Sequence, residues 1–156
     1  MIVGLISDTH GLVRPDVHIA LAGVDLILHA GDVGGEEILA ELEVIAPVRA
    51  VFGNTDAVDH PGLVDAIDIE LEGVRIHVSH GHELGRSASP AARAAAYAAD
   101  VVVYGHTHRQ RVDQVGGTLV VNPGAAGARR FDLEPSVARL TVADGIAAVA
   151  LIPLAR

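Results

Sequence analysis

Seven side chains of types that bind metal ions follow short apolar runs of this sequence. They are Asp8, His10, Asp32, Asn54, His80, His106 and His108. One residue separates Asp8 from His10, and one residue separates His106 from His108. In an extended chain alternate side chains leave on the same side, so each pair can point at one place. Because open α/β sheets bind ligands beyond the carboxyl ends of their strands, we expect one sheet edge to gather all seven.

The donor types indicate a hydrolytic centre with two divalent ions. Structural zinc favours a closed set of four ligands, often with Cys, and this chain has no Cys. Seven oxygen and nitrogen ligands exceed what one ion with an open position needs, and they suit two ions that share a carboxylate. Imidazole and carboxylate suit Mn, Fe, Co, Ni or Zn, and we expect manganese first. Two such ions about 3.5–4 Å apart can bind a phosphate and lower the pKa of a bridging water.

Each short motif has an ordinary structural explanation when it is taken alone. Asp-x-His occurs by chance, and Gly-Asp and Gly-Asn are usually turns. Here glycine directly precedes Asp32, Asn54 and His106 and directly follows His80. Glycine allows the close backbone approach that converging side chains need. The metal-site interpretation rests on the ordered set of motifs behind successive strand-like runs.

Three residues are the candidates for catalysis: Asp32, Asn54 and His82. Asp32 is a carboxylate that two ions could share, and Asn54 is a candidate contact for a phosphate oxygen. His82 leaves two interpretations open, because it could face the centre and contact phosphate or merely cap a turn. Asp56 could orient Asn54 or the local turn. The expected reaction is in-line attack on phosphorus by a hydroxide that bridges the metals, without a covalent nucleophile.

Short strands must position these residues. Helices separate the early strands, and tight turns separate several of the later ones. The Val- and Ile-rich runs that predict buried strands lie at 2–6, 26–28, 48–52, 74–78, 101–104 and 119–121. Helices are expected at 16–22 after Pro15, at 36–42, and at 91–99 with Ser89 as the N-cap. Gly-containing pairs between strand-like runs indicate hairpins. These pairs lie at 72–73, 116–117 and 144–145. The predicted architecture is α/β, with parallel strands early and antiparallel pairs later.

Composition narrows the class of protein. The 156 residues fit one domain over residues 1–156, with an aliphatic core because aromatic residues are scarce. The net charge of −9 argues against binding of a nucleic-acid polymer or an anionic membrane surface. We see no secretory signal and no apolar stretch of transmembrane length, so we expect a cytoplasmic protein. The expected partner is a small phosphate ester.

The motifs resemble those of calcineurin-like metallophosphoesterases, most closely the small YfcE-type phosphodiesterase branch. They occur in family order, ending with Asn122-Pro123-Gly124. The resemblance implies two mixed β-sheets packed as a sandwich and flanked by helices, and a homo-oligomer. It assigns Asp8, His10 and His108 to one metal. It assigns Asn54, His80 and His106 to the other, with Asp32 bridging.

Two positions depart from the family pattern. Larger members carry a His that helps protonate the leaving group, and Thr55 stands there in this chain. The small phosphodiesterase branch also tends to lack this His, so Thr55 favours phosphodiesters. Gln110 stands two residues after the last His of the motifs, where related enzymes often have Pro. The alternatives are a phosphomonoesterase or pyrophosphohydrolase at the same site, and a noncatalytic scaffold like the retromer subunit of this fold.

Overall fold

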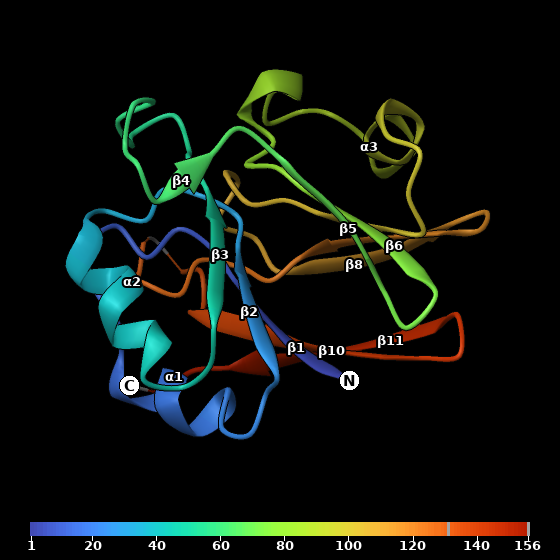
Figure 1. Cartoon of the computed structure of the whole chain (residues 1–156). Coiled ribbons are helices and arrows are strands. Elements are labelled where there is room, and N and C mark those ends of the chain that lie inside the picture. The colour runs from blue at the N-terminus through green and yellow to red at the C-terminus, as the bar shows by residue number, and fades with distance from the viewer. Residues whose placement is uncertain (131, 156) are drawn as a thin grey trace.

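The computed structural model describes residues 1–130 and 132–155, which form two mixed β-sheets packed face to face (Figure 1). The first sheet has the order β11 (Ile146–Pro153), β10 (Ser136–Ala143), β1 (Ile2–Ile6), β2 (Leu26–His29), β3 (Val48–Val51) and β4 (Leu63–Val64). The second has the order β5 (Ile67–Leu71), β6 (Val74–Val78), β7 (Val101–Val103), β9 (Thr118–Asn122) and β8 (Arg111–Val115). The sandwich of mixed sheets implied by the family resemblance is thus confirmed.

Each sheet combines a parallel part with antiparallel pairs. In the first sheet β1, β2, β3 and β4 run parallel to one another, and β10 lies antiparallel to β1 and β11. In the second sheet β6, β7 and β9 are parallel, while β5 and β8 pair antiparallel at the two edges. We expected antiparallel pairs in the second half of the chain. These pairs are present, but β6, β7 and β9 of the same half are parallel.

The three predicted hairpins are present, and two of them have the backbone that their turn residues favour. Glu72 and Gly73 have φ of 50° and 80°, and Asp144 and Gly145 have φ of 51° and 77°. Positive φ at both central residues is the type I′ geometry that matches the twist of paired strands. The pairs β5–β6, β8–β9 and β10–β11 close around these turns.

Aliphatic side chains fill two layers of core. Between the sheets, Leu5 and Leu28 of the first meet Val78 and Val103 of the second. On the outer face of the first sheet, α1 (Pro15–Ala20) and α2 (Glu36–Glu43) cover a second cluster that includes Leu42. Burial of such side chains contributes roughly 1.5–3 kcal/mol each. These two layers hold the strand ends, and hence the residues that follow them, in fixed positions.

The third helix, α3 (Pro90–Ala96), begins as predicted and ends earlier than expected. Ser89 accepts a hydrogen bond from the Ala92 N–H at 3.1 Å, which confirms its role as N-cap. The helix ends before Tyr97, which is extended, with φ −134°. The Tyr97 ring stacks on His77 with the ring centroids 3.6 Å apart, so tertiary contact takes this residue out of the helix.

Two short elements were not predicted: β4 and the 3₁₀ helix η1 (His82–Leu84). Both are too short to produce a periodic sequence signal. Among the described residues, no helix is long and apolar enough to cross a bilayer.

Candidate metal centre

The segments that follow five strands bring the seven candidate ligands to one end of the sandwich. Those after β1, β2 and β3 carry Asp8, His10, Asp32 and Asn54, and those after β6 and β7 carry His80, His106 and His108. The ligands thus come from both sheets. The expectation that a single sheet edge gathers all seven was wrong, because β6 and β7 pair in the second sheet.

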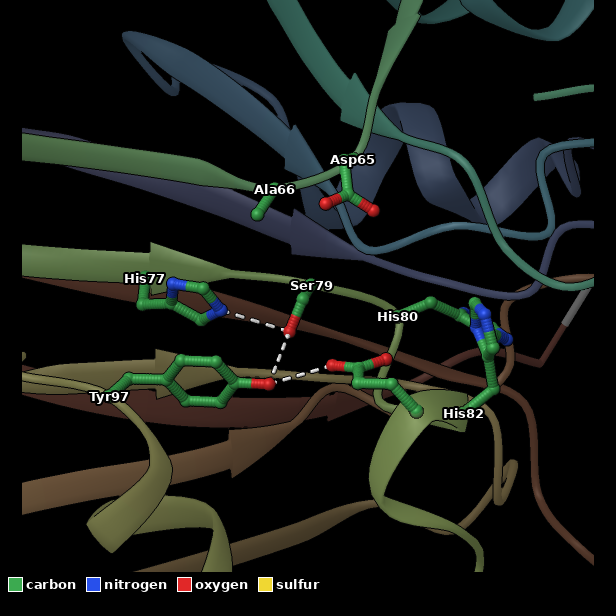
Figure 2. A pocket seen from close by; sticks show the side chains of 8 residues that line it. Asp65, Ala66, His77, Ser79, His80, His82 and Tyr97 are labelled. Atoms are coloured by element: carbon green, nitrogen blue, oxygen red, sulfur yellow. Dashed lines mark hydrogen bonds between the residues drawn. The ribbon is translucent and has the colours of Figure 1, made fainter. Parts of the chain in front are cut away.

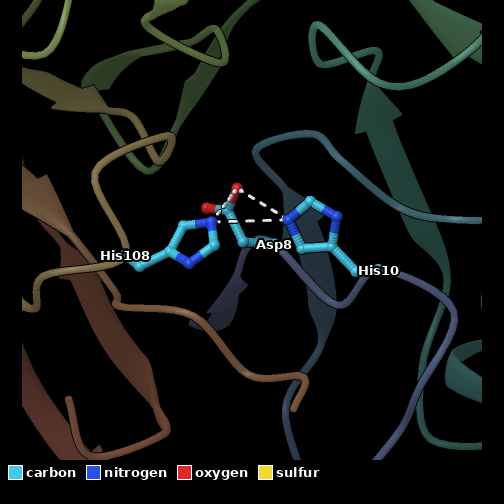
Figure 3. A group of neighbouring side chains, drawn as sticks. All are labelled: Asp8, His10 and His108. Atoms are coloured by element: carbon cyan, nitrogen blue, oxygen red, sulfur yellow. Dashed lines mark hydrogen bonds and ion pairs between the residues drawn. The ribbon is translucent and has the colours of Figure 1, made fainter. Parts of the chain in front are cut away.

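Asp8, His10 and His108 form the first cluster, with ligand atoms within 4.8 Å of one another (Figure 3). His108 Nε2 lies 3.4 Å and His10 Nε2 lies 3.7 Å from Asp8 Oδ1. The two Nε2 atoms are 3.4 Å apart. This is the set of three residues that the family resemblance assigns to one metal.

Asp8, Asp32 and His80 form the second cluster. His80 Nε2 lies 3.2 Å from Asp32 Oδ2, 3.8 Å from Asp8 Oδ1 and 3.1 Å from Asn54 Oδ1. Asp32 Oδ2 is also 3.6 Å from His10 Nε2. Both carboxylates therefore lie between the two clusters, so Asp8 as well as Asp32 is placed where a shared ligand would be.

His106 and His82 complete the centre at its more exposed side. The His106 ring lies 5.2 Å from the His80 ring between centroids, and His106 belongs to neither cluster. The His82 ring lies 5.3 Å from His80 and 6.2 Å from His106. His82 Nδ1 is buried and has no hydrogen-bond partner among the described residues. His82 begins η1 with its ring near the candidate ligands His80 and His106, and its contact with phosphate stays a prediction.

The backbone at the candidate ligands is unusual. Five of the seven have a left-handed φ of 47° to 69°: Asp8, His10, Asp32, His106 and His108. Non-glycine residues rarely adopt this conformation, which costs of the order of 1–3 kcal/mol, and such residues cluster at functional sites. The sandwich therefore holds strained turns at the place where these side chains converge.

Two glycines allow the turns to approach each other closely. A Cβ at Gly53 would overlap Asp32 Oδ1, and a Cβ at Gly105 would overlap Ser7 Oγ and crowd Asp8 Oδ2. Glycine is needed at both positions because any side chain would displace an aspartate. This gives a physical reason for the Gly-Asn and Gly-His motifs of the sequence.

Asp56 joins the turns that follow β2 and β3. Its carboxylate accepts hydrogen bonds from the backbone N–H of Val33 at 3.0 Å, Gly34 at 3.2 Å and Gly53 at 2.9 Å. Asp56 thereby fixes the turn that presents Asn54.

The centre combines ionised carboxylates with imidazoles. Burial opposes ionisation of Asp8, but His10, His108 and His80 outweigh it and hold the pKa of Asp8 well below its usual range. Burial also raises the pKa of Asp32, but the contacts with His80 and with the Thr55 N–H outweigh burial and lower this pKa to about 2. Burial opposes protonation of His80, and the two carboxylates raise its pKa. Two anionic groups in a buried site need cationic partners.

The residues present fit a pair of metal ions. Asp8 Oδ2 accepts hydrogen bonds from Ser7 Oγ at 2.7 Å and the His106 N–H at 3.0 Å. Asp8 Oδ1 is buried without a hydrogen-bond partner among the described residues, and three imidazole Nε2 atoms surround it at 3.4–3.8 Å. His80 Nδ1 donates to Ala30 O at 2.8 Å, which leaves its Nε2 lone pair free to bind a cation. A divalent cation would satisfy a buried carboxylate oxygen that faces three imidazole nitrogens.

A pocket of about 220 Å³ lies beside the centre and is lined in part by His80 and His82 (Figure 2). Ser79 Oγ hydrogen-bonds His77 Nε2 at 3.0 Å and donates to Tyr97 Oη at 3.3 Å. Tyr97 Oη donates to Glu83 Oε1 at 2.7 Å. This chain of contacts ties the end of β6 to η1 and so supports the position of His82.

Sequence reasoning missed Arg93, which is 2% exposed on α3. Its guanidinium donates to Gly81 O at 3.3 Å and to Gly85 O at 2.9 Å. It thereby fixes the segment that carries His82. A lone Arg in an alanine-rich helix gives no signal of burial, because burial there depends on the neighbouring sheet and loop.

Residues 1–145 match the model of the calcineurin-like phosphoesterase superfamily domain. The chain belongs to this superfamily. A probable metallophosphoesterase of Methanothermobacter thermautotrophicus is 36% identical over 154 residues, covering 93% of this chain and 87% of that protein. A phosphodiesterase of Methanocaldococcus jannaschii is 29% identical over 142 residues, covering 80% of this chain and 83% of that protein.

Solved structures share the fold over almost the whole chain. The phosphoesterase YfcE of E. coli superposes with a TM-score of 0.69 at 26% identity, covering 97% of this chain and 98% of that chain. A Vps29 single mutant of Entamoeba histolytica superposes with a TM-score of 0.83 at 24% identity, covering 99% of each chain. The resemblance to metallophosphoesterases and to YfcE is confirmed, and the Vps29 fold keeps the scaffold alternative open.

Proposed function

We propose that this chain hydrolyses small phosphodiesters with the help of two divalent metal ions, manganese first among the candidates. The observation that carries the proposal is the buried Asp8 Oδ1, which has no hydrogen-bond partner in residues 1–130 and 132–155 and faces three imidazole nitrogens. When bound, the ions would neutralise phosphate oxygens and activate a water for attack on phosphorus in line with the leaving oxygen.

The side chains of the centre divide into those that would hold the ions and those that would contact substrate. Asp8, His10 and His108 would hold one ion; Asn54, His80 and His106 would hold the other, with Asp32 shared. Asn54 is exposed at the mouth of the centre, so its amide is also available to a phosphate oxygen. Asp32 would be fixed for its role by the Thr55 N–H, which donates to Oδ1 at 3.0 Å.

Thr55 favours a phosphodiester over a monoester. Its hydroxyl is far too weak an acid to protonate a leaving oxygen, so the imidazole of larger superfamily members has no counterpart at this position. His82 is the nearest alternative acid, since its ring packs against His80 and His106 and no described residue hydrogen-bonds its Nδ1. A pyrophosphohydrolase at the same site remains the competing substrate class.

The decisive experiment joins metal analysis of the purified protein to a panel of phosphodiesters, monoesters and pyrophosphates. We expect metal-dependent turnover, fastest on bis(para-nitrophenyl) phosphate. His108→Asn should lower kcat/KM more than about 100-fold. The matched control, His18→Asn, changes a partly exposed histidine on α1 and should have no effect. A protein that binds metal and turns over no ester would favour the noncatalytic scaffold.

A further inference from the structure

Four of the eleven basic residues of this chain line one pocket of about 260 Å³. We call it the arginine pocket. Its lining includes Arg86, Arg93, Tyr104, Thr107, Arg109 and Arg111. The concentration of positive charge is local, because the net charge of the chain is −9.

Arg93 forms the inner wall of the arginine pocket, and no carboxylate of the described residues pairs with it. The contacts recorded for its guanidinium are with neutral groups, the carbonyls of Gly81 and Gly85 and the ring of Tyr104, which lies 4.0 Å from Cζ. Removing a charge from water is costly unless other groups compensate it. Carbonyl dipoles and an aromatic face stabilise the cation but do not cancel its charge, so the pocket keeps a positive field.

The outer wall adds further guanidinium groups. Arg86 and Arg109 are exposed, and neither has an ion pair within residues 1–130 and 132–155. Arg111 is paired with Asp113, with Nε and Oδ2 2.7 Å apart. Three of the four arginines therefore have no anionic partner in the described structure.

The arginine pocket adjoins the metal centre. Thr107 lies between the candidate ligands His106 and His108, and its Oγ1 accepts hydrogen bonds from Asn122 Nδ2 at 3.0 Å and the Arg109 N–H at 3.3 Å. Arg86 and Thr107 line the same pocket, so the arginine pocket borders the segment that carries His106 and His108. A ligand held at the centre can thus extend past Thr107 toward Arg86.

We propose that the arginine pocket binds a second anionic group of the substrate, so that the preferred phosphoester carries a phosphate or carboxylate at its far end. This inference rests on the proposed function for the reacting phosphate. Guanidinium groups bind phosphate and carboxylate through paired, charge-assisted hydrogen bonds. The two exposed arginines supply free donors, and the buried one supplies a fixed charge behind them.

The test compares two esters that release the same leaving group. One is para-nitrophenyl propyl phosphate, and the other carries an additional phosphate on the far carbon of the propyl chain. With the metal-loaded protein, we expect kcat/KM to favour the second ester by at least about tenfold. The double variant Arg86→Gln/Arg109→Gln should bring this ratio close to one, mainly through KM. Arg49→Gln, an exposed arginine on β3 outside the pocket, should keep the parent ratio.

A binding measurement gives a reading that does not depend on turnover. Propyl phosphate and propanediol bisphosphate are titrated calorimetrically into the metal-loaded protein. The bisphosphate should bind at least about tenfold more tightly to the parent and to Arg49→Gln, and the advantage should disappear in the double variant. Added salt should weaken the advantage, because two of the arginines are exposed.

The outcomes separate this inference from the proposed function. If both esters are hydrolysed with equal kcat/KM and both ligands bind equally, the arginine pocket has no role in anion binding and the phosphoesterase stands. If neither ester is hydrolysed but the bisphosphate still binds more tightly through Arg86 and Arg109, the arginine pocket binds anions and the proposed phosphodiester hydrolysis is wrong.

Discussion

At the scale of single residues, the two aspartates determine what the centre can bind. Asp8 Oδ1 and Asp32 Oδ2 each lie within 4 Å of imidazole nitrogens from both clusters. Both carboxylates are ionised at neutral pH, since the pKa of each is lowered. Loss of either charge should therefore affect two ions rather than one.

Replacing Asp32 by Asn tests this sharing. Asp32→Asn keeps the shape of the side chain and an acceptor for the Thr55 N–H, but removes the negative charge. We expect the bound metal to fall from two ions per chain to one or none, with kcat/KM reduced by more than about 100-fold. Metal content after gel filtration and turnover of bis(para-nitrophenyl) phosphate are the measurements. Asp59→Ala, an exposed residue, is the control. One tightly bound ion in the fully loaded parent, with an active Asp32→Asn, would contradict the two-ion centre.

The proposed function makes Thr55 a determinant of leaving-group preference. A positioned acid typically contributes roughly 10²–10⁴-fold to hydrolysis, and a threonine hydroxyl cannot serve. The parent should therefore favour aryl over alkyl leaving groups. Thr55→His should gain most on substrates with basic leaving groups and little on nitrophenyl esters. The measurement is kcat/KM across esters of graded leaving-group pKa at fixed metal. A parent that shows no such dependence, while chemistry limits the rate, has another proton donor, and His82 is the first to test.

At the scale of elements, the turns after the strands carry the strain and the close contacts of the centre. Gly53 has ordinary backbone angles, so only the approach of Asp32 excludes a side chain there. Gly53→Ala should displace the Asp32 carboxylate and lower kcat/KM by roughly 100-fold, the effect expected of a misplacement of about 1 Å. Gly117→Ala is the matched control, because a Cβ there meets no atom within 4 Å. Equal activity of the two variants would show that the turn adjusts without cost.

Most of the element pattern could be predicted because it follows from local chemistry. Val- and Ile-rich runs mark the strands, Ser89-Pro90 marks a helix start, and Glu72-Gly73 marks a hairpin. The ends of elements were less predictable where tertiary contacts decide them, as at Tyr97, which stacks on His77. For the same reason the burial of Arg93 could not be predicted, because it depends on the loop after β6.

The candidate site was predictable as a set of residues but not as an arrangement. Spacing selected Asp8, His10 and the later histidines because each follows a strand. The structure brings Asp8, His10, His80 and His108 into the two clusters and places His106 beside them. The division of the ligands between two sheets depends on β6 pairing with β7 instead of with the first sheet. No local pattern encodes that choice.

At the scale of the whole molecule, His29 links folding stability to pH. Burial, opposed in part by Asp8 and Asp56, lowers the pKa of His29 to about 4 from 6.5. The neutral ring is required, because Nδ1 accepts the Gly31 N–H at 3.1 Å while Nε2 contacts Thr9 Oγ1 at 3.0 Å. Below pH 6.5 the unfolded chain binds a proton that the folded chain excludes until about pH 4.

The unfolding free energy should therefore fall as the pH drops from 6.5 toward 4, by roughly 3 kcal/mol in total from this residue. The His29 contribution should be constant above that range. His29→Asn removes the titrating group, so the difference in unfolding free energy between parent and variant should shrink across this window. Urea denaturation in the presence of a metal chelator measures this difference in unfolding free energy, with His18→Asn as the control. Parallel curves for parent and His29→Asn from pH 7 to pH 4.5 would rule the linkage out.

The position of β1 has a consequence for the protein while it is being synthesised. β1 lies in the interior of the first sheet and pairs with β10, with Ile2 opposite Thr141. Asp8 and His10, the first of the candidate ligands to be made, therefore follow a strand whose antiparallel partner is made only after all seven candidate ligands. A nascent chain that ends after His108 contains all seven candidate ligands but lacks β8, β9, β10 and β11. The complete centre should accordingly form only after the hairpin of β10 and β11 has been made.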